Sequence, residues 1–136
     1  MTTPETSTRS VVMEKEFPHP LQKVWRALTE SSLIEQWLMK NDFQPVTGHR
    51  FNLRADWGAV DGQVLVVELN KTLSYTWAAY GLESVVTFTL TPTGAGTHLR
   101  MEQSGFPADG EQYYQGAKWG WQKFLGNLDQ VLAKLE

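Results

Sequence analysis

The last part of the sequence, from about residue 109 to residue 136, predicts one long amphipathic helix. With successive residues 100° apart, the apolar side chains fall within one arc of about 120°. They are Tyr113, Tyr114, Ala117, Trp121, Phe124, Leu125, Leu128, Val131, Leu132 and Leu135. At 1.5 Å per residue the helix is about 38 Å long, roughly the width of a small domain. A helix of this length with one broad apolar face requires a sheet to lie on.

The sequence before this helix predicts such a sheet. Apolar and polar residues alternate there, and short turn sequences separate the alternating segments. The predicted strands are residues 9–17, 48–56, 60–69, 72–79, 84–91 and 97–104. The short connections favour antiparallel pairing, because parallel strands need longer crossovers.

Two short helices are predicted between the first and second strands. The first follows Pro20, which suits a first helical position, and its apolar residues are Leu21, Val24, Trp25 and Leu28. In the second, Ser32 and Glu35 have the spacing of a capping box, and the apolar residues are Leu33, Ile34, Trp37 and Leu38. The order is β-α-α-β-β-β-β-β-α. We expect one domain over residues 9–136, preceded by a flexible tail over residues 1–8.

The composition argues against several classes of protein. The net charge of −3, without a basic run, argues against binding to nucleic acid or to an anionic membrane surface. No apolar run approaches the roughly 20 residues that cross a bilayer. The absence of cysteine excludes disulfides and thiolate sites and fits a reducing compartment. The polar N-terminal residues lack the apolar core of a signal peptide, so we expect a cytoplasmic protein.

Conventional catalytic motifs are missing from the sequence. The three histidines, His19, His49 and His98, do not have metal-ligand spacing, and Ser104 is not in a nucleophile elbow. We therefore predict no catalytic residue, no metal and no cofactor, and an enzyme is not favoured. One alternative stays open, in which folding brings Asp56 or Glu102 to the mouth of a cavity as an acid or base.

A set of motifs in a fixed order covers nearly all of the chain from residue 9 to residue 136. The motifs are Pro20-x-x-x-Val24-Trp25-x-Ala27-Leu28-Thr29, Leu33 with Trp37, Gly48-His49-Arg50-Phe51, Gly62, Leu73-Ser74-Tyr75-Thr76-Trp77, Thr87-Phe88-Thr89-Leu90-Thr91-Pro92, Thr97-x-Leu99, Ser104-Gly105-Phe106, and Gly120-Trp121 followed by Leu125, Leu128 and Leu132. The set resembles the heat-shock protein 90 ATPase activator homologue-like family, within the SRPBCC or START-like superfamily.

The resemblance implies an α+β helix-grip fold. In that fold a curved antiparallel sheet of about six strands wraps a long C-terminal helix, and two short helices close one end. In many relatives a cavity between sheet and helix binds apolar or amphipathic small molecules, and in a few it is an active site, for example for aromatic polyketide cyclisation. Eukaryotic co-chaperone members carry an additional N-terminal domain and a linker, which this sequence lacks, so a chaperone partner is not favoured.

Strand alternation predicts which side chains would line such a cavity. The candidates are Trp37, Phe51, Leu53, Leu65, Val67, Tyr75, Trp77, Val86, Phe88, Leu99, Met101, Gln103, Ala117, Trp121 and Phe124. Residues 64–67 are all apolar, so alternation does not distinguish the inner face from the outer face there, and we choose Leu65 and Val67 as inward-facing. Gln103 is the polar residue that alternation places inward, where it either orients a ligand or bonds to backbone. The alternative is that these side chains fill a solid core.

The long helix contains two further features. Gly116, Gly120 and Gly126 each cost about 1 kcal/mol relative to alanine, so they either open room for a ligand or allow tight packing on the sheet. Trp119 lies off the apolar arc, where it either packs on a loop or anchors a dimer.

Three functions follow from these features. We expect first a module that binds a hydrophobic small molecule, lipid-like or flat and aromatic, with a stress-related role and a monomeric or weakly dimeric state. The alternatives are a cavity-based enzyme of cyclase or hydrolase type and a co-chaperone-like interaction domain. An exposed apolar patch around Trp119 or Trp57 would favour the last.

Overall fold

The computed structural model describes residues 8–56, 58–79, 81–107 and 111–135. Its elements, in order, are β1 (Thr8–Phe17), α1 (Leu21–Thr29), α2 (Ser31–Trp37), β2 (Lys40–Asn41), β3 (Arg50–Ala55), β4 (Gly58–Glu68), β5 (Thr72–Ala79), β6 (Leu82–Pro92), β7 (Thr97–Pro107) and α3 (Glu111–Lys134). The predicted N-terminal tail up to residue 7, the predicted helix start at Asp109 and the proposed patch at Trp57 lie outside the described residues.

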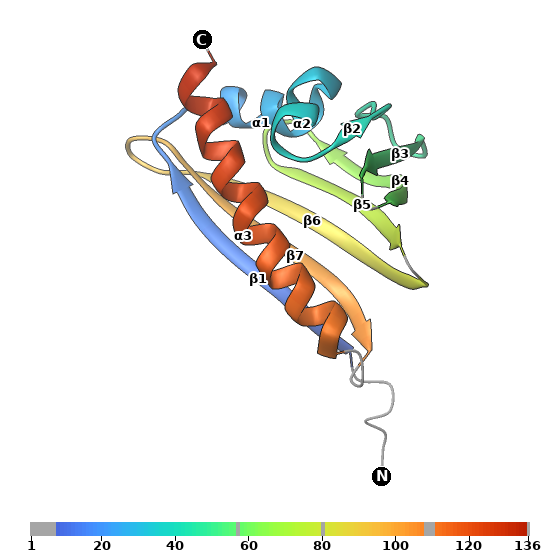
Figure 1. The fold of residues 1–136 in the computed structure, drawn as a ribbon. Coiled ribbons are helices and arrows are strands. Elements are labelled where there is room, and N and C mark those ends of the chain that lie inside the picture. Colours follow the sequence, from blue (N-terminus) through green and yellow to red (C-terminus); the bar gives the residue numbers. More distant parts are fainter. Residues whose placement is uncertain (1–7, 57, 80, 108–110, 136) are drawn as a thin grey trace.

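The strands form one antiparallel sheet in the order β1-β7-β6-β5-β4-β3-β2. Helix α3 crosses one face of this sheet along β1 and β7, and α1 and α2 lie at the end where α3 finishes (Figure 1). The predicted helix-grip architecture and antiparallel pairing are confirmed.

The seven-stranded sheet has one strand more than the sequence predicted. The extra strand, β2, is two residues long and pairs Lys40 with Arg54 and Asn41 with Leu53. The Asn41 side chain holds it in place by donating to the carbonyl oxygens of Ser31 and Met39. A two-residue strand shows no alternation, so the sequence pattern could not reveal it.

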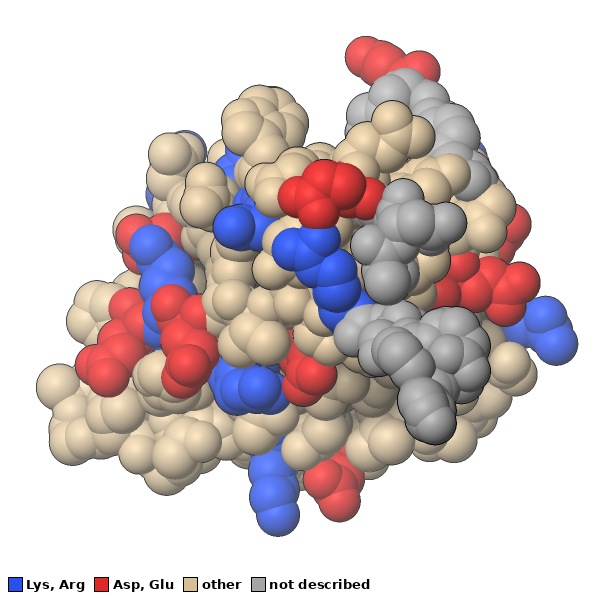
Figure 2. Space-filling view, turned by 90° about the horizontal axis from the view of Figure 1, so that it is seen from below, with Lys and Arg blue, Asp and Glu red and all other residues tan. Residues whose placement is uncertain are grey.

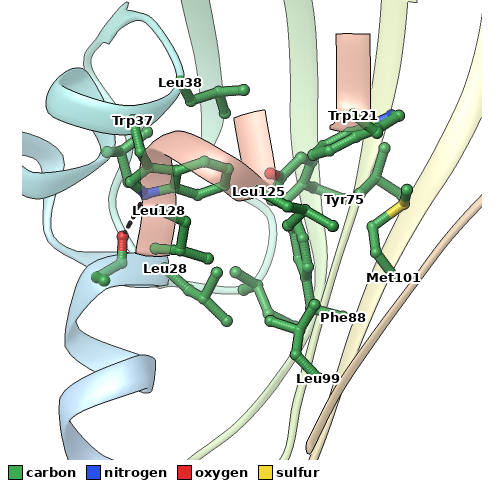
Figure 3. Packing of buried hydrophobic residues seen from close by; sticks show 14 of the residues in the cluster. Leu28, Trp37, Leu38, Tyr75, Phe88, Leu99, Met101, Trp121, Leu125 and Leu128 are labelled. Carbon is green, nitrogen blue, oxygen red and sulfur yellow. Dashed lines mark hydrogen bonds between the residues drawn. The ribbon is translucent and has the colours of Figure 1, made fainter. Parts of the chain in front are cut away.

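The core fills the space between α2, the middle of α3 and the centre of the sheet. Trp37 is buried, and its indole N–H donates to the carbonyl oxygen of Ala27 at 2.8 Å (Figure 3). The Trp37 and Phe88 rings meet edge to face with centroids 6.3 Å apart, and Tyr75 meets Phe51 in the same way at 5.1 Å. In this half of the molecule the predicted inward-facing residues pack against one another.

The choice of Leu65 as an inward-facing residue is wrong. Leu65 is 42% exposed, whereas Val64 is 1% exposed and lies in the core. The pairing of β4 with β5 shifts register between Val64 and Val66, which changes which residues face the core. Val67 beyond the irregularity packs partly buried against the core. Because this segment is apolar on both faces, its sequence does not show where the register shifts.

The predicted start of the second short helix is also wrong. Helix α2 begins at Ser31, and its N-cap is Glu30, which makes no side-chain capping bond. Glu30 is also the C-cap of α1, so one residue joins the two helices and the capping box at Ser32 does not form. Pro20 is the N-cap of α1 rather than its first helical residue, with an extended ψ of 159°.

Candidate ligand-binding cleft

A partly open cleft lies between the N-terminal half of α3 and the ends of β5, β6 and β7, with a volume of about 340 Å³. We call it the α3 cleft. Its lining residues are Trp77, Ala79, Leu82, Gln103, Phe106, Gln112, Tyr113, Gly116, Ala117, Trp119, Gly120, Trp121 and Phe124. None of these described lining residues carries a charge. The lining is therefore apolar, with a small number of neutral hydrogen-bonding groups.

Aromatic side chains form much of the cleft wall. The Trp77 and Trp121 rings have centroids 5.5 Å apart, and Trp121 meets Phe124 at 5.6 Å and Phe88 at 5.9 Å. Trp121 is buried, so these contacts hold its ring against the sheet. Trp119 differs, because it is 67% exposed and has the Lys123 ammonium 5.5 Å from its ring centroid. The cleft thus has fixed inner rings and one exposed indole among its lining.

A chain of buried hydrogen bonds crosses from α3 to the sheet behind the cleft. The Trp121 indole N–H donates to Gln103 Oε1 at 2.7 Å, Gln103 Nε2 donates to Ser84 Oγ at 2.8 Å, and the Ser84 hydroxyl donates to the carbonyl oxygen of Trp77 at 2.9 Å. An indole nitrogen can only donate, so the Gln103 oxygen must face Trp121. Gln103 is 2% exposed and joins α3, β7 and β6. Its inward direction agrees with strand alternation, and its partners are side chains rather than backbone.

The predicted cavity residues divide into three groups. Those that line the α3 cleft are Trp77, Gln103, Ala117, Trp121 and Phe124. Those packed in the core away from the cleft lining are Trp37, Phe51, Leu53, Val67, Tyr75, Val86, Phe88, Leu99 and Met101. Leu65 belongs to neither group. The space between sheet and helix is thus filled in its α2 half and open in the half near the start of α3.

Two of the lining residues that were not among the candidates were missed because two strands are longer than predicted. Strand β6 begins at Leu82 and β7 continues to Pro107, which brings Leu82 and Phe106 to the cleft. Phe106 is fully buried although simple alternation from Gln103 would place it outward. Gly105 between them has φ +110°, and a Cβ there would lie 3.0 Å from the carbonyl oxygen of Glu83. This local irregularity, which requires glycine, turns Phe106 inward.

Tyr75 places a hydroxyl group inside the core. Its side chain is buried between Phe43, Phe51 and Phe88, and Figure 3 shows it on the inner side of the sheet facing α3. Within the described part of the chain this hydroxyl has no hydrogen-bond partner. Burial raises the pKa of Tyr75 well above its ordinary value, because the phenolate would be desolvated.

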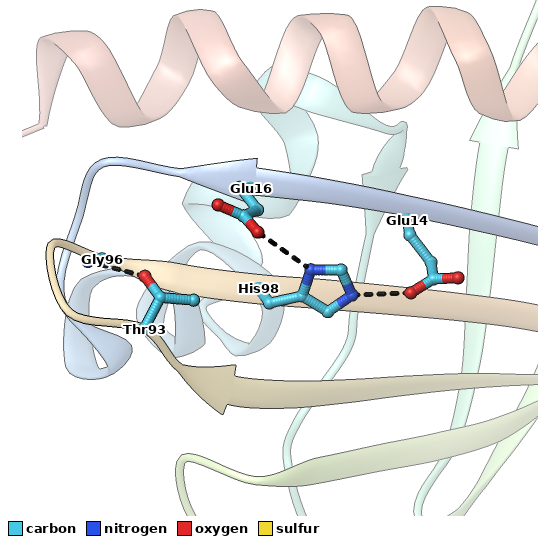
Figure 4. A network of polar contacts seen from close by, with 5 residues as sticks. All are labelled: Glu14, Glu16, Thr93, Gly96 and His98. Atoms are coloured by element: carbon cyan, nitrogen blue, oxygen red, sulfur yellow. Dashed lines mark hydrogen bonds and ion pairs between the residues drawn. The ribbon is translucent and has the colours of Figure 1, made fainter.

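The histidines lie away from the cleft lining. His98, on the outer face of β7, lies between two carboxylates of β1: its Nε2 is 2.7 Å from Glu14 Oε1 and its Nδ1 is 3.7 Å from Glu16 Oε2 (Figure 4). The pKa of His19 is lowered by burial and by the nearby Lys23 ammonium. Among the residues that the structure describes, no group of acidic or histidine side chains is arranged to hold a metal ion.

The charges on the surface are mixed. On the face seen in Figure 2, Lys and Arg side chains lie beside Asp and Glu side chains, and much of the face is neither basic nor acidic. Within the described residues, none of the helices is both long enough and apolar enough to span a membrane.

Comparison with known proteins identifies the family. The model of the Activator of Hsp90 ATPase homolog 1-like protein family matches residues 18–133, most of the chain. The protein belongs to this family. The resemblance seen in the sequence motifs is thereby confirmed. Among curated proteins, none matches this chain.

Solved structures of relatives share the fold over nearly the whole chain. Protein MLL2253 from Mesorhizobium loti is 58% identical with a TM-score of 0.91, over 94% of this chain and 99% of that one. Protein BH1534 from Bacillus halodurans is 30% identical with a TM-score of 0.80, over 91% and 96%. DynU16, described as a protein in the dynemicin biosynthetic locus, is 28% identical with a TM-score of 0.84, over 92% of this chain and 47% of DynU16.

Proposed function

We propose that this protein binds an apolar or amphipathic small molecule in the α3 cleft. The observation that carries the proposal is the cleft itself, an uncharged and aromatic-walled space of about 340 Å³ beside a core of packed apolar side chains. Ligand sites of proteins typically have volumes of about 300–1,000 Å³ and mostly apolar walls with a few polar groups. The lining side chains stack on a ligand and donate or accept hydrogen bonds, which supports binding as the role of the cleft.

Two further observations support a small-molecule ligand. Trp119 is exposed at the cleft, and a ligand that covers its indole removes apolar surface from water at about 25 cal/mol per Å². The similarity to DynU16, from a biosynthetic locus, is in keeping with a small organic molecule as the occupant.

Native mass spectrometry of the protein purified without refolding tests the proposal, followed by extraction and identification of any bound molecule. We expect a stoichiometric apolar passenger, or binding from a panel of lipids and flat aromatic compounds. Trp119→Ala should weaken this binding at least several-fold with little change in stability, because the side chain is exposed. Leu69→Ala is the matched control, since Leu69 is 75% exposed and does not line the cleft.

A protein that is empty and binds no member of the panel would refute the proposal. Equal effects of the Trp119 and Leu69 substitutions would place the ligand outside the α3 cleft.

A further inference from the structure

Two glycines of α3 face the cleft at helical spacing. Gly116 and Gly120 lie in the interior of the helix, one turn apart, and both line the α3 cleft. Each destabilises the helix by about 1 kcal/mol relative to alanine. Such a cost calls for a reason in the backbone or in the packing.

Neither reason applies at these positions. The two glycines are not among those with positive φ, so the backbone does not require glycine there. Among the described residues, a Cβ built on Gly116 meets nothing within 4 Å, and one built on Gly120 meets Phe124 Cε2 at 3.8 Å, an ordinary contact. The explanation by tight packing on the sheet is therefore wrong, and the glycines leave open space in front of the helix backbone on the cleft side.

An independent observation points to an occupant of the same space. The Gln103 amide has two N–H groups, and one of them donates to Ser84 Oγ. The second has no partner within the described residues, although the side chain is 2% exposed and lines the cleft. A buried amide N–H without an acceptor costs free energy that a ligand oxygen would recover.

We propose that Gly116, Gly120 and Gln103 make the α3 cleft selective for a flat, uncharged ring system that carries an oxygen acceptor. The ring lies against the α3 backbone at the two glycines, where side chains would otherwise hold it away. The oxygen of the ligand accepts a hydrogen bond from the second N–H of the Gln103 amide. An uncharged ligand is required because the described lining offers no opposite charge to offset the desolvation of an ion. The inference rests on the proposed binding function and specifies its ligand class.

The test compares Gly116→Ala and Gly120→Ala with the matched control Gly126→Ala. Gly126 lies in the same helix and does not line the cleft, and a Cβ there also meets none of the described residues within 4 Å. Each variant is titrated with 9-fluorenone by calorimetry, and its thermal midpoint is measured without ligand. We expect all three variants to be more stable than the wild type, since each gains helix propensity. Binding should weaken at least about tenfold in the two cleft variants and stay unchanged in Gly126→Ala.

Three ligands test the proposed class on the wild-type protein. Fluorene has the same ring system as 9-fluorenone without the carbonyl oxygen, and camphor has a carbonyl on a globular apolar frame. We expect 9-fluorenone to bind about three- to tenfold more tightly than fluorene, as one hydrogen bond allows, and more tightly than camphor.

The outcomes separate this inference from the proposed function. If the wild type binds apolar ligands but Gly116→Ala and Gly120→Ala behave like Gly126→Ala, or if camphor or fluorene binds as well as 9-fluorenone, ligand binding stands and the selectivity is refuted. If none of the three ligands nor any member of the panel binds, the proposed function fails, and the selectivity fails with it.

Discussion

The hydrogen bond between Trp121 and Gln103 makes a quantitative prediction about how α3 is held to the sheet. Gln103→Leu removes the oxygen that accepts the hydrogen bond from the Trp121 indole N–H. Trp121→Phe removes the N–H that donates this bond. Both side chains are 2% exposed, so each single substitution leaves a buried polar group without its partner. The Ser84 hydroxyl retains its acceptor in either case, because it donates to the carbonyl oxygen of Trp77.

The expected size follows from the cost of an unpaired buried group. Leaving the Trp121 N–H without an acceptor costs about 1–3 kcal/mol, so we expect Gln103→Leu to lower the free energy of unfolding by about 2 kcal/mol. In a domain of this size that change lowers the thermal midpoint by roughly 5–10 °C. Trp121→Phe should cost more, since it also removes part of the ring contacts with Trp77 and Phe88.

A double-mutant cycle measured by urea denaturation isolates the bond itself. In the double variant neither partner is left unpaired, so its destabilisation should be smaller than the sum of the two single effects by at least about 1 kcal/mol. Gln63→Leu is the control, because the Gln63 side chain makes its bond to Gly48 at the surface, and it should change stability by less than about 0.5 kcal/mol. Single effects that add to within about 0.5 kcal/mol would refute the proposed pairing of Trp121 with Gln103.

Two other predictions concern the core. Tyr75→Phe removes a buried hydroxyl that has no partner in the described residues, so the free energy of unfolding should stay equal or rise by up to about 1 kcal/mol. Because burial raises the folded-state pKa of Tyr75 above the unfolded value of about 10, the wild type should lose stability as pH rises above 10, and Tyr75→Phe should lose less in urea denaturation from pH 8 to 11. A loss above 1 kcal/mol at pH 8 would mean that the hydroxyl is bonded. Val64→Ala should cost about 2 kcal/mol and Leu65→Ala less than about 0.5 kcal/mol, since only Val64 is buried; the reverse order would contradict the register of β4.

Much of the fold could be predicted because its signals are local. The apolar arc of α3 and the alternation in β5, β6 and β7 depend on residues a few positions apart. The structure confirms the alternation, and it buries the arc from Trp121 onward while Tyr113 near the helix start is exposed. The errors occur where the local signal is absent or ambiguous. Strand β2 is too short to show alternation, so the sequence pattern does not predict it. Strand β4 is apolar on both faces around Leu65, so the pattern does not predict the shift in its register with β5.

The candidate site was predictable only in part, for a related reason. Alternation indicates which face of a strand a side chain occupies, but not what lies in front of that face. Phe88 and Trp121 both point inward, yet Phe88 packs against Trp37 in the core whereas Trp121 lines the α3 cleft. The difference arises because α1 and α2 lie at the end of the sheet where α3 finishes (Figure 1), whereas the cleft lies near the start of α3.

The sequence by itself determined that this protein has short antiparallel strands and one long helix with an apolar face, because hydrophobic periodicity is a property of neighbouring residues. Its ordered motifs added the family resemblance, and that resemblance implied how these elements assemble into a helix-grip fold. Only the tertiary structure decided that the space is filled beside Trp37 and open beside Gly116 and Gly120. It also decided that the side-chain oxygen of Gln103 accepts a hydrogen bond from the Trp121 indole. The position of the cleft and the hydrogen bond of Gln103 both depend on distances between segments that are far apart in the chain. Hydrophobic periodicity carries no information about those distances.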